Sequence, residues 1–489
     1  MKRRRFLSVT SAMAAGTALG AASARGLFAA PVPARRVTLA TPSPEQLAWQ
    51  RRERALFLHF GVNTFTGREW GDGTEDPRIF NPEQLDARQW VRAAKSAGFA
   101  SLVLTAKHHD GFCLWPSAQT THSVKSSPWK NGAGDVVREF TDACRAEGVG
   151  AGLYLSPWDR HEPSYGDSPR YNDHYERQLT ELLTGYGPLT EVWFDGANGE
   201  GPNGKRQVYD WPRVHATVRR LQPRALMFSD AGPDIRWMGN EAGVAGDPNW
   251  CAMDPAAVPY PGADGPQIIS SLQHGDPFGT VWRPGEADVS IRPGWFWRES
   301  ENEKVRSAEN LASLYFSSVG RNANLLLNVP PTANGTLHDR DVRALAEFGE
   351  RIAALHANDE AVHARVSAEG TPDRAHRPAM AVDPDPDTYF SPGLDARTAR
   401  ITLDFDRPVT FDVVALHEAI REGQTIEAHQ VVGMRDGQPV AIASGTTIGN
   451  RRLHRVPPMT VDSLRIVARS TIGPVRISRV SLLSMERGG

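Results

Sequence analysis

The sequence has few cysteines and lacks the short motifs that mark several common enzyme classes. Only three cysteines occur in 489 residues, Cys113, Cys144 and Cys251, and none of them stands in a C-x-x-C spacing. This pattern argues against a disulfide framework and against a structural zinc site. An H-E-x-x-H motif is absent, and no G-x-G-x-x-G follows the first apolar run. Neither a zinc-protease site nor a dinucleotide site is therefore indicated.

The chain also lacks a strong net charge and a long apolar run. Lys and Arg number 55 against 57 Asp and Glu, which leaves a net charge of −2, so neither nucleic acid nor an anionic membrane is an expected partner. No stretch after the N-terminal region is long and apolar enough to span a bilayer. With 40% hydrophobic and 23% charged residues the composition is that of a soluble globular protein. Thirteen tryptophans stand out, because indole rings line sugar sites as well as protein cores.

The N-terminus differs from the rest of the chain. Residues 1–30 have a basic head, a weakly apolar Ala/Gly-rich middle and an A-S-A end near Ala24, which predicts a cleavable export signal and linker. The run R-R-R-F-L at residues 3–7 matches the twin-arginine pattern of bacterial export. We therefore expect a periplasmic or secreted protein, and folding before export agrees with the sparse cysteines. A surface helix with basic ends is the alternative.

Residues 40–360 predict a (β/α)8-type barrel. Continuous apolar runs alternate with amphipathic segments that close on a glycine, as parallel strands and their covering helices do. An open doubly wound sheet is the alternative. The predicted strands are A-L-F-L-H-F-G, S-L-V-L-T-A, G-A-G-L-Y-L-S, E-V-W-F-D-G, A-L-M-F-S-D and N-L-L-L-N-V.

Residues 365–489 have a different pattern and predict an antiparallel β-sandwich. Short, β-branched and often alternating segments such as A-R-I-T-L-D-F-D and D-S-L-R-I-V-A-R are separated by Gly, Pro and Asp turns. A helix-like segment near residues 345–356 joins the two domains. Aromatic residues are few in the sandwich, which favours a role in supporting the barrel over a role in binding glycan.

Polar and ionisable residues follow the predicted barrel strands. Functional residues of such barrels gather at the C-terminal ends of the strands, so these residues are candidates for one site. Any one of them could be a structural residue, but their position on the same edge favours an active site. They are His59, Asn63, Lys107, His108, His109, Asp110, Asp159, Asp195, Asp230, Arg236 and Glu241.

Two kinds of chemistry fit histidines beside carboxylates. A metallohydrolase could draw ligands from His59, His108, His109 and Asp195. However, adjacent residues on an extended backbone point in opposite directions, so His108 and His109 both reach one metal only if the strand ends there. A glycosidase needs two carboxylates on either side of a sugar, together with polar donors and aromatic walls.

Asp195 and Glu241 are the best pair of carboxylates for a glycosidase. Asp195 ends the run V-W-F-D and is followed by a glycine that leaves room for close approach, so it is the candidate nucleophile. Glu241 stands in a loop of Gly, Asn and Arg, a suitable place for a general acid. The alternatives are a helix N-cap for Asp195 and a solvated loop carboxylate for Glu241.

Several ordered motifs carry a resemblance to a known family. F-L-H-F-G-V-N-T-F, E-W-G-D-G, T-A-K-H-H-D-G-F-C-L-W, G-L-Y-L-S-P-W-D and V-W-F-D-G-A together resemble the α-L-fucosidases of glycoside hydrolase family 29, from about residue 45 to 360. D-I-R-W-M-G-N-E-A-G and W-R-P-G-E-A-D-V-S-I-R-P-G-W-F-W resemble the subfamily that removes α-1,3- and α-1,4-linked fucose from branched glycans.

The resemblance implies a retaining double displacement on a fucosylated oligosaccharide or glycoconjugate, without metal or cofactor. Asp195 matches the nucleophile and Glu241 the acid/base. Three further alternatives stay open: a fucosidase of broader linkage range, a metal-dependent hydrolase and a non-catalytic fucose-binding protein. The residues implied to contact the sugar are His59, His108 and His109 at its hydroxyls, Trp193 and Phe57 around its methyl group, and Glu69 and Trp70 at its border.

Overall fold

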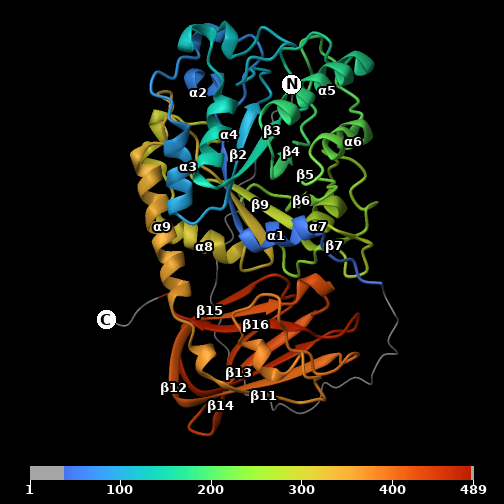
Figure 1. The fold of residues 1–489 in the computed structure, drawn as a ribbon, viewed down its shortest axis with the longest axis vertical. Coiled ribbons are helices and arrows are strands. Elements are labelled where there is room, and N and C mark those ends of the chain that lie inside the picture. Colours follow the sequence, from blue (N-terminus) through green and yellow to red (C-terminus); the bar gives the residue numbers. More distant parts are fainter. Residues whose placement is uncertain (1–37, 486–489) are drawn as a thin grey trace. The chain divides into compact units, whose positions relative to one another are not determined.

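Within residues 38–485, the part of the chain that the computed structural model describes, eight parallel strands close into a barrel (Figure 1). The predicted export signal at residues 1–30 lies outside the described residues. The order around the barrel is β1-β10-β9-β6-β5-β4-β3-β2. The strands are β1 (Arg54–Leu58), β2 (Ser101–Lys107), β3 (Gly150–Leu155), β4 (Glu191–Trp193), β5 (Leu226–Ser229), β6 (Ile235–Trp237), β9 (Gly285–Ser290) and β10 (Ala323–Asn328).

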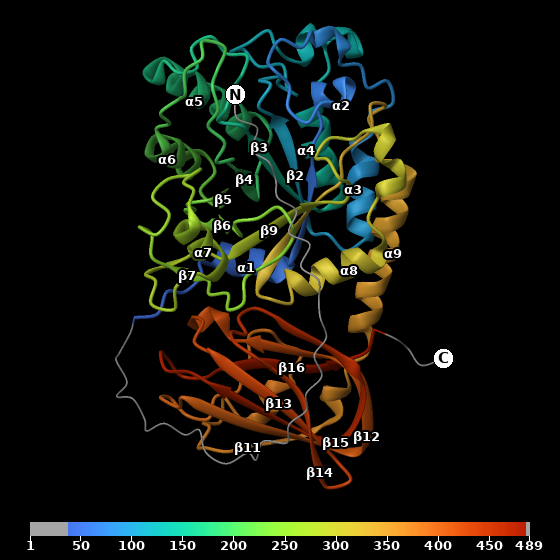
Figure 2. The same cartoon turned by 180° about the vertical axis from the view of Figure 1, so that it is seen from behind.

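Helices cover the outside of the barrel, and α3 and α9 pack side by side there (Figure 2). Several covering helices begin with a side-chain cap from Asp or Ser, as at Asp86, Asp135 and Ser307, whereas Asp167 before α5 forms no such cap. The helices are α1 (Pro44–Arg52), α2 (Val62–Thr66), α3 (Ala87–Ser96), α4 (Val136–Glu147), α5 (Ser168–Gly185), α6 (Trp211–Leu221), α7 (Pro266–His274), α8 (Ala308–Ser317) and α9 (Asp339–Ala357).

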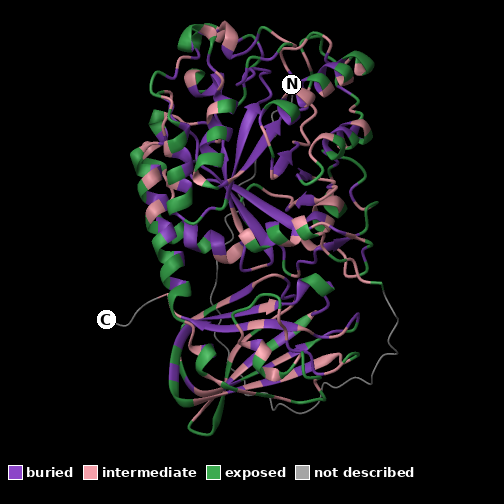
Figure 3. Ribbon diagram, in the orientation of Figure 1, coloured by how far each residue is buried: buried purple, intermediate pink, exposed green. Residues whose placement is uncertain are grey.

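The barrel strands are buried on both faces, whereas the helices alternate buried and exposed residues (Figure 3). This explains why most of the strands appear in the sequence as continuous apolar runs. An exception is β9, which carries the buried Glu286 and Asp288 and was not predicted as a strand. The connection between β6 and β9 departs from the simple βα repeat. It runs through residues 238–284 and carries α7 and a small two-stranded sheet of β7 (Ala252–Met253) and β8 (Val281–Trp282).

The C-terminal region is antiparallel, and the predicted fold class is confirmed. Two of its strands are longer than the sequence pattern indicated. The segment D-S-L-R-I-V-A-R is only the last part of β15, and A-R-I-T-L-D-F-D is only the first part of β12. Register shifts at Asp404/Val409 and Phe411/Val413 bend it, so β11 pairs with its first half and β16 with its second. The strands are β11 (Arg365–Ala368), β12 (Thr398–Glu418), β13 (Ala428–Arg435), β14 (Gln438–Gly445), β15 (Arg452–Arg469) and β16 (Ile477–Leu483).

Buried amide side chains join the barrel to the sandwich. The Asn249 side chain donates to the carbonyl of Arg321 at 2.8 Å, and its backbone N–H donates to Thr447 Oγ1 at 3.0 Å. Gln424 donates to the Asn249 carbonyl at 3.0 Å and accepts from the backbone of Cys251 at 2.8 Å. Because buried polar groups are costly when unpaired, this network favours one fixed arrangement of these segments.

The three cysteines, Cys113, Cys144 and Cys251, are buried, and none of them forms a disulfide bond. Among residues 38–485, no helix has the length and hydropathy needed to cross a membrane.

Candidate active site

The nine predicted site residues lie around the C-terminal ends of the barrel strands. His59 follows β1, and His108 and His109 follow β2, while Asp195 follows β4 and Glu241 lies in the loop after β6. Parallel strands in a barrel end at the same rim, which places residues from distant parts of the sequence in one site.

Asp195 is held by hydrogen bonds on both carboxylate oxygens. The Tyr154 hydroxyl donates to Oδ2 at 3.1 Å, and the backbone N–H of Ala197 donates to Oδ1 at 2.7 Å. His109 Nε2 lies 3.9 Å from Oδ2. The next residue must be glycine, because a Cβ at Gly196 would lie 2.2 Å from Asp230 Oδ2. The side chain of Asp195 keeps 27% of its surface exposed, so the held carboxylate remains accessible.

Glu241 has a different environment from Asp195. It is exposed at the mouth of the site, yet the surrounding protein and the negative charge of Asp195 raise its pKa, with a smaller contribution from Glu69. A hydrogen bond from the Trp295 side chain acts in the opposite direction. One carboxyl is thus held by hydrogen-bond donors, whereas the other retains a proton more readily. Such a difference is typical of acid and nucleophile pairs.

Two further carboxyls near this pair have raised pKa values. Burial and the charge of Asp195 raise the pKa of Asp230 to about 7, and its Oδ2 accepts from the backbone of Gly262 at 2.8 Å. Burial and the charge of Glu241 raise the pKa of Asp288 well above its usual value, while Trp237 Nε1 donates to Asp288 Oδ1 at 2.8 Å. Because both carboxyls hold a proton more readily than usual, they limit the repulsion between Asp195 and its neighbours.

Burial keeps the rings of His59 and His108 neutral. Burial lowers the pKa of His59 to about 3, and its Nδ1 lies 2.8 Å from Asn328 Oδ1, an acceptor, so Nδ1 carries the proton. Its Nε2 is then a free acceptor. Burial also lowers the pKa of His108, whose Nδ1 has no hydrogen-bond partner within residues 38–485. An unpaired buried nitrogen is costly, and a sugar hydroxyl would satisfy it.

His109 is oriented by the end of β3. Its Nδ1 lies 2.8 Å from Ser156 Oγ, which donates its own proton to the carbonyl of Trp158 at 2.6 Å. Ser156 therefore accepts from His109, which leaves Nε2 directed at Asp195 at 3.9 Å. Burial lowers the pKa of His109, although the charge of Asp195 opposes this.

The rings of His108 and His109 lie on the same side of the backbone. The ring centroids are 4.1 Å apart, and the ring planes are inclined by 36°. Strand β2 ends at Lys107, so the side chains that follow no longer alternate between the two faces of the sheet. The alternation of side chains along an extended strand therefore does not keep the His108 and His109 rings apart. Even so, among the described residues no group of three or more His, Cys, Asp or Glu side chains is arranged to hold a metal ion.

Phe57 and Trp193 form an apolar floor below the histidines. The ring centroid of Phe57 lies 4.5 Å from that of His59 and 5.2 Å from that of Trp193. Phe57 and Trp193 are both buried. Trp193 stacks on Phe228, with the ring centroids 4.1 Å apart and the ring planes within 9° of parallel. Its indole N–H donates to Glu286 Oε2 at 3.1 Å, inside the barrel, which leaves an apolar surface toward the site.

Glu69 and Trp70 stand at the rim on one loop. Glu69 accepts from the backbone of Trp295 at 2.6 Å and is paired with Arg298. The Trp70 ring is 57% exposed and lies 6.0 Å, edge-on, from His109. Glu69 therefore holds the loop to the end of β9, and Trp70 has a face open to solvent.

Tyr154, Asp288 and Trp295 were not predicted as site residues from the sequence. Tyr154 has a polar group inside the apolar strand β3, which is a usable signal, because a polar group in a buried strand needs a partner. Asp288 lies in β9, whose mixed sequence did not predict a strand. Trp295 lies in the W-F-W segment, where the sequence does not distinguish the indole that faces the site from its neighbours.

Comparisons with known proteins point to one family. A protein-family model described as Alpha-L-fucosidase matches residues 45–355. Alpha-L-fucosidase 1 of Arabidopsis thaliana is 46% identical over 85% of this chain and 82% of its own length. The crystal structure of SpGH29 is 40% identical, covers 92% of this chain and 99% of its own, and has a TM-score of 0.86. A Ruminococcus gnavus GH29 fucosidase in complex with fucose is 33% identical over 94% of this chain and 98% of its own, with a TM-score of 0.83.

Proposed function

The chain belongs to the α-L-fucosidase family of glycoside hydrolases, and from this premise we propose that it releases α-1,3/1,4-linked L-fucose from branched, Lewis-type glycans with retention of configuration. The observation that carries the proposal is the contrast between two neighbouring carboxyls. Asp195 is held by Tyr154 and the Ala197 backbone, and Glu241 has a raised pKa.

In the proposed mechanism, Asp195 attacks the anomeric carbon while Glu241 protonates the departing glycosidic oxygen. The fucosyl–enzyme bond then forms as the glycosidic bond breaks. Glu241, now ionised, takes a proton from water, and the resulting hydroxide displaces Asp195 to release fucose. His59, His108 and His109 would orient the sugar hydroxyls, with Phe57 and Trp193 below the methyl group.

The test compares fucose release from a Lewis-type trisaccharide and from 2′-fucosyllactose, with Asp195→Asn as the control. We expect release from the trisaccharide alone, and loss of this release in the variant. Release from both substrates would replace the linkage preference with a broader range. Proton NMR of the first product distinguishes retention from inversion, since retention gives α-L-fucose before mutarotation.

A non-catalytic fucose-binding protein and a metal-dependent hydrolase give different results in the same experiment. A binding protein would retain fucose affinity in Asp195→Asn and release no product from either substrate. A metal-dependent enzyme would lose activity on chelation. Export through the twin-arginine route is a separate proposal, tested by whether Arg4→Lys with Arg5→Lys abolishes processing of the precursor.

A further inference from the structure

A second cavity lies where the barrel meets the sandwich. Its volume is about 430 Å³, within the roughly 300–1,000 Å³ of typical ligand pockets. Glu53, which lines it, precedes β1, whereas His59 follows the same strand. The cavity and the candidate active site are therefore at opposite ends of the barrel, and fucose hydrolysis makes no use of this cavity.

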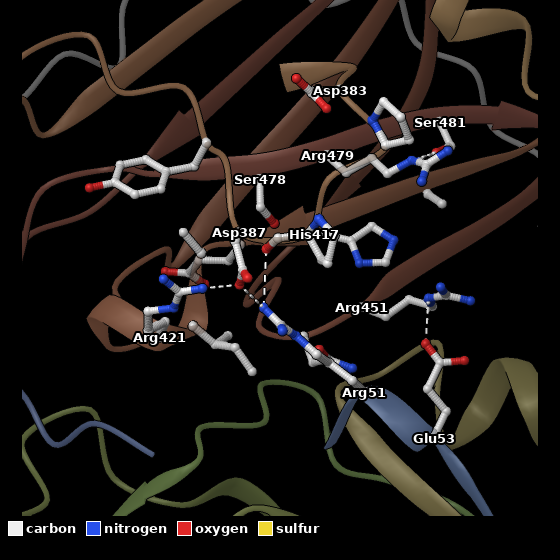
Figure 4. Close-up of a pocket in the computed structure, with 18 of the residues that line it drawn as sticks. Arg51, Glu53, Asp383, Asp387, His417, Arg421, Arg451, Ser478, Arg479 and Ser481 are labelled. Atoms are coloured by element: carbon white, nitrogen blue, oxygen red, sulfur yellow. Dashed lines mark hydrogen bonds and ion pairs between the residues drawn. The ribbon is translucent and has the colours of Figure 1, made fainter. Parts of the chain in front are cut away.

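Ion pairs hold the outer wall of the cavity (Figure 4). Arg51 from the end of α1 and Arg421 from the sandwich both bind the carboxylate of Asp387, the first at 2.6 Å. Asp387 is half exposed, so these pairs contribute little stability. Their effect is geometric, because they orient two guanidinium groups at the opening.

Two more arginines of the cavity are fixed by ion pairs. Arg451 Nε lies 2.9 Å from Glu53 Oε1 (Figure 4), and Arg479 Nη2 lies 3.0 Å from Asp359 Oδ2. Each guanidinium has five N–H donors, so these pairs leave other donors for a ligand. Besides these four arginines, six acidic side chains line the cavity, so it is not a site of excess positive charge.

Three groups facing the cavity are only partly used by the protein (Figure 4). Asp383 accepts from the backbone of Asp385 at 2.9 Å but forms no ion pair with any described residue. The Ser478 side chain forms no hydrogen bond within the described part of the chain. His417 is kept neutral, because burial and the charges of Arg451 and Arg479 hold its pKa well below the usual value.

These groups present both acceptors and donors to one small space. Asp383 is an acceptor, and the Ser478 hydroxyl can accept or donate. A neutral His417 ring that donates to the Asn450 backbone keeps its other nitrogen as an acceptor. A sugar, whose hydroxyls donate and accept at fixed spacing, matches such a wall better than a single anion does. Tyr389 adds an aromatic ring to the lining.

We propose that this cavity is a second, non-catalytic carbohydrate site that takes a neutral sugar unit of a glycan. It would hold a glycan chain to the enzyme without contributing to cleavage. The proposal is independent of turnover at Asp195, so it can fail without affecting the proposed function.

The test measures lactose binding to the whole chain by calorimetry, with L-fucose at saturation to occupy the active site. Asp383→Ala removes the free acceptor, and Asp385→Ala is the matched control. Each of the two aspartates accepts a backbone N–H two residues further on, but only Asp383 lines the cavity. We expect about tenfold or more weaker binding in Asp383→Ala and unchanged binding in Asp385→Ala.

A second variant guards against a local change in the turn. Ser478→Met fills the cavity from β16 and is expected to abolish lactose binding, while fucose release stays unchanged. Three results would overturn the proposal: no lactose binding under fucose saturation, equal loss in the two aspartate variants, or displacement of lactose by inorganic sulfate at matched ionic strength.

Discussion

The loop that carries Glu69 and Trp70 is attached to the end of β3 by hydrogen bonds to two backbone carbonyls. His161 Nδ1 lies 2.7 Å from the Gly73 carbonyl, and Arg160 donates to the Gly71 carbonyl. The approach is close, because a Cβ at Gly73 would lie 2.2 Å from the Arg160 carbonyl oxygen. Gly73 also has a φ of 85°, which only glycine adopts readily. We therefore predict that His161 positions Trp70 for the sugar.

The proposed perturbation is His161→Ala. It removes the donor to the buried carbonyl of Gly73, and an unpaired buried acceptor costs about 1–3 kcal/mol. Every 1.4 kcal/mol is about a factor of ten. If this free-energy cost destabilises the loop in the sugar-bound state, kcat/KM should fall by about 5- to 100-fold. Most of the change should appear in KM.

The assay is the kinetics of fucose release, together with thermal unfolding. His161→Asn is the matched control, because an Asn side-chain N–H can replace the Nδ1 donor, whereas both variants lose the stacking of His161 on His122 at 4.0 Å. We expect Asn to restore most of the activity. Equal activity of the alanine variant and the natural protein would refute the positioning role. Equal losses in the two variants would assign the effect to the ring stacking.

Five other predictions test the site and its support. Glu241→Gln should lower kcat on glycans by about 10²–10⁴-fold and much less on an aryl fucoside, whose leaving group needs no proton. Because the pKa of Glu241 is raised, kcat/KM in the natural protein should fall as pH rises through a value above the usual 4.5, as a pH–rate profile would show. In Lys107→Met, Asp159 stays buried but loses the ion-pair partner whose Nζ lies 2.9 Å away. The free energy of unfolding measured in urea should therefore fall by about 3–5 kcal/mol, and by less when Asp159→Asn is added. Burial opposes the ionisation of Asp159, but Lys107 lowers its pKa to about 2. About 2 kcal/mol of folding stability, fully present above pH 3.8, should therefore be lost as the pH falls toward 2. The Asp159→Asn variant should not show this loss. Glu286→Leu removes the acceptor of the Trp193 N–H at 3.1 Å and should raise KM, whereas Glu286→Gln keeps an acceptor and should not.

Local sequence patterns predicted six of the eight barrel strands as continuous apolar runs, because most strands covered on both faces are apolar. They did not predict β6, which has only three residues, or β9, which carries the buried Glu286 and Asp288. The runs A-L-F-L and N-L-L-L-N correspond to β1 and β10, which pair in the closed barrel. The same reasoning failed to predict the length of β12. Its bend occurs through register shifts against β15, and pairing with a distant strand leaves no signature in a short segment.

The candidate site was predicted in part, through motifs at the ends of strands. His59, His108, His109 and Asp195 could be named from the sequence, because ionisable residues that follow an apolar run are conspicuous there. Their roles in catalysis stay predictions. Tyr154 was not identified, because its hydroxyl finds Asp195 across neighbouring strands, 41 positions further along the chain.

The sequence by itself determined most of the segments that become strands and helices, and which residues stand at their ends, because these depend on local periodicity and on neighbouring residues. Only the tertiary structure decided how the ionisable groups act on one another. The raised pKa of Glu241 and the neutral state of His59 come from burial and from charges on other strands. Burial and electrostatic interaction depend on distance in space, and distances between segments far apart in the chain exist only after the barrel has closed.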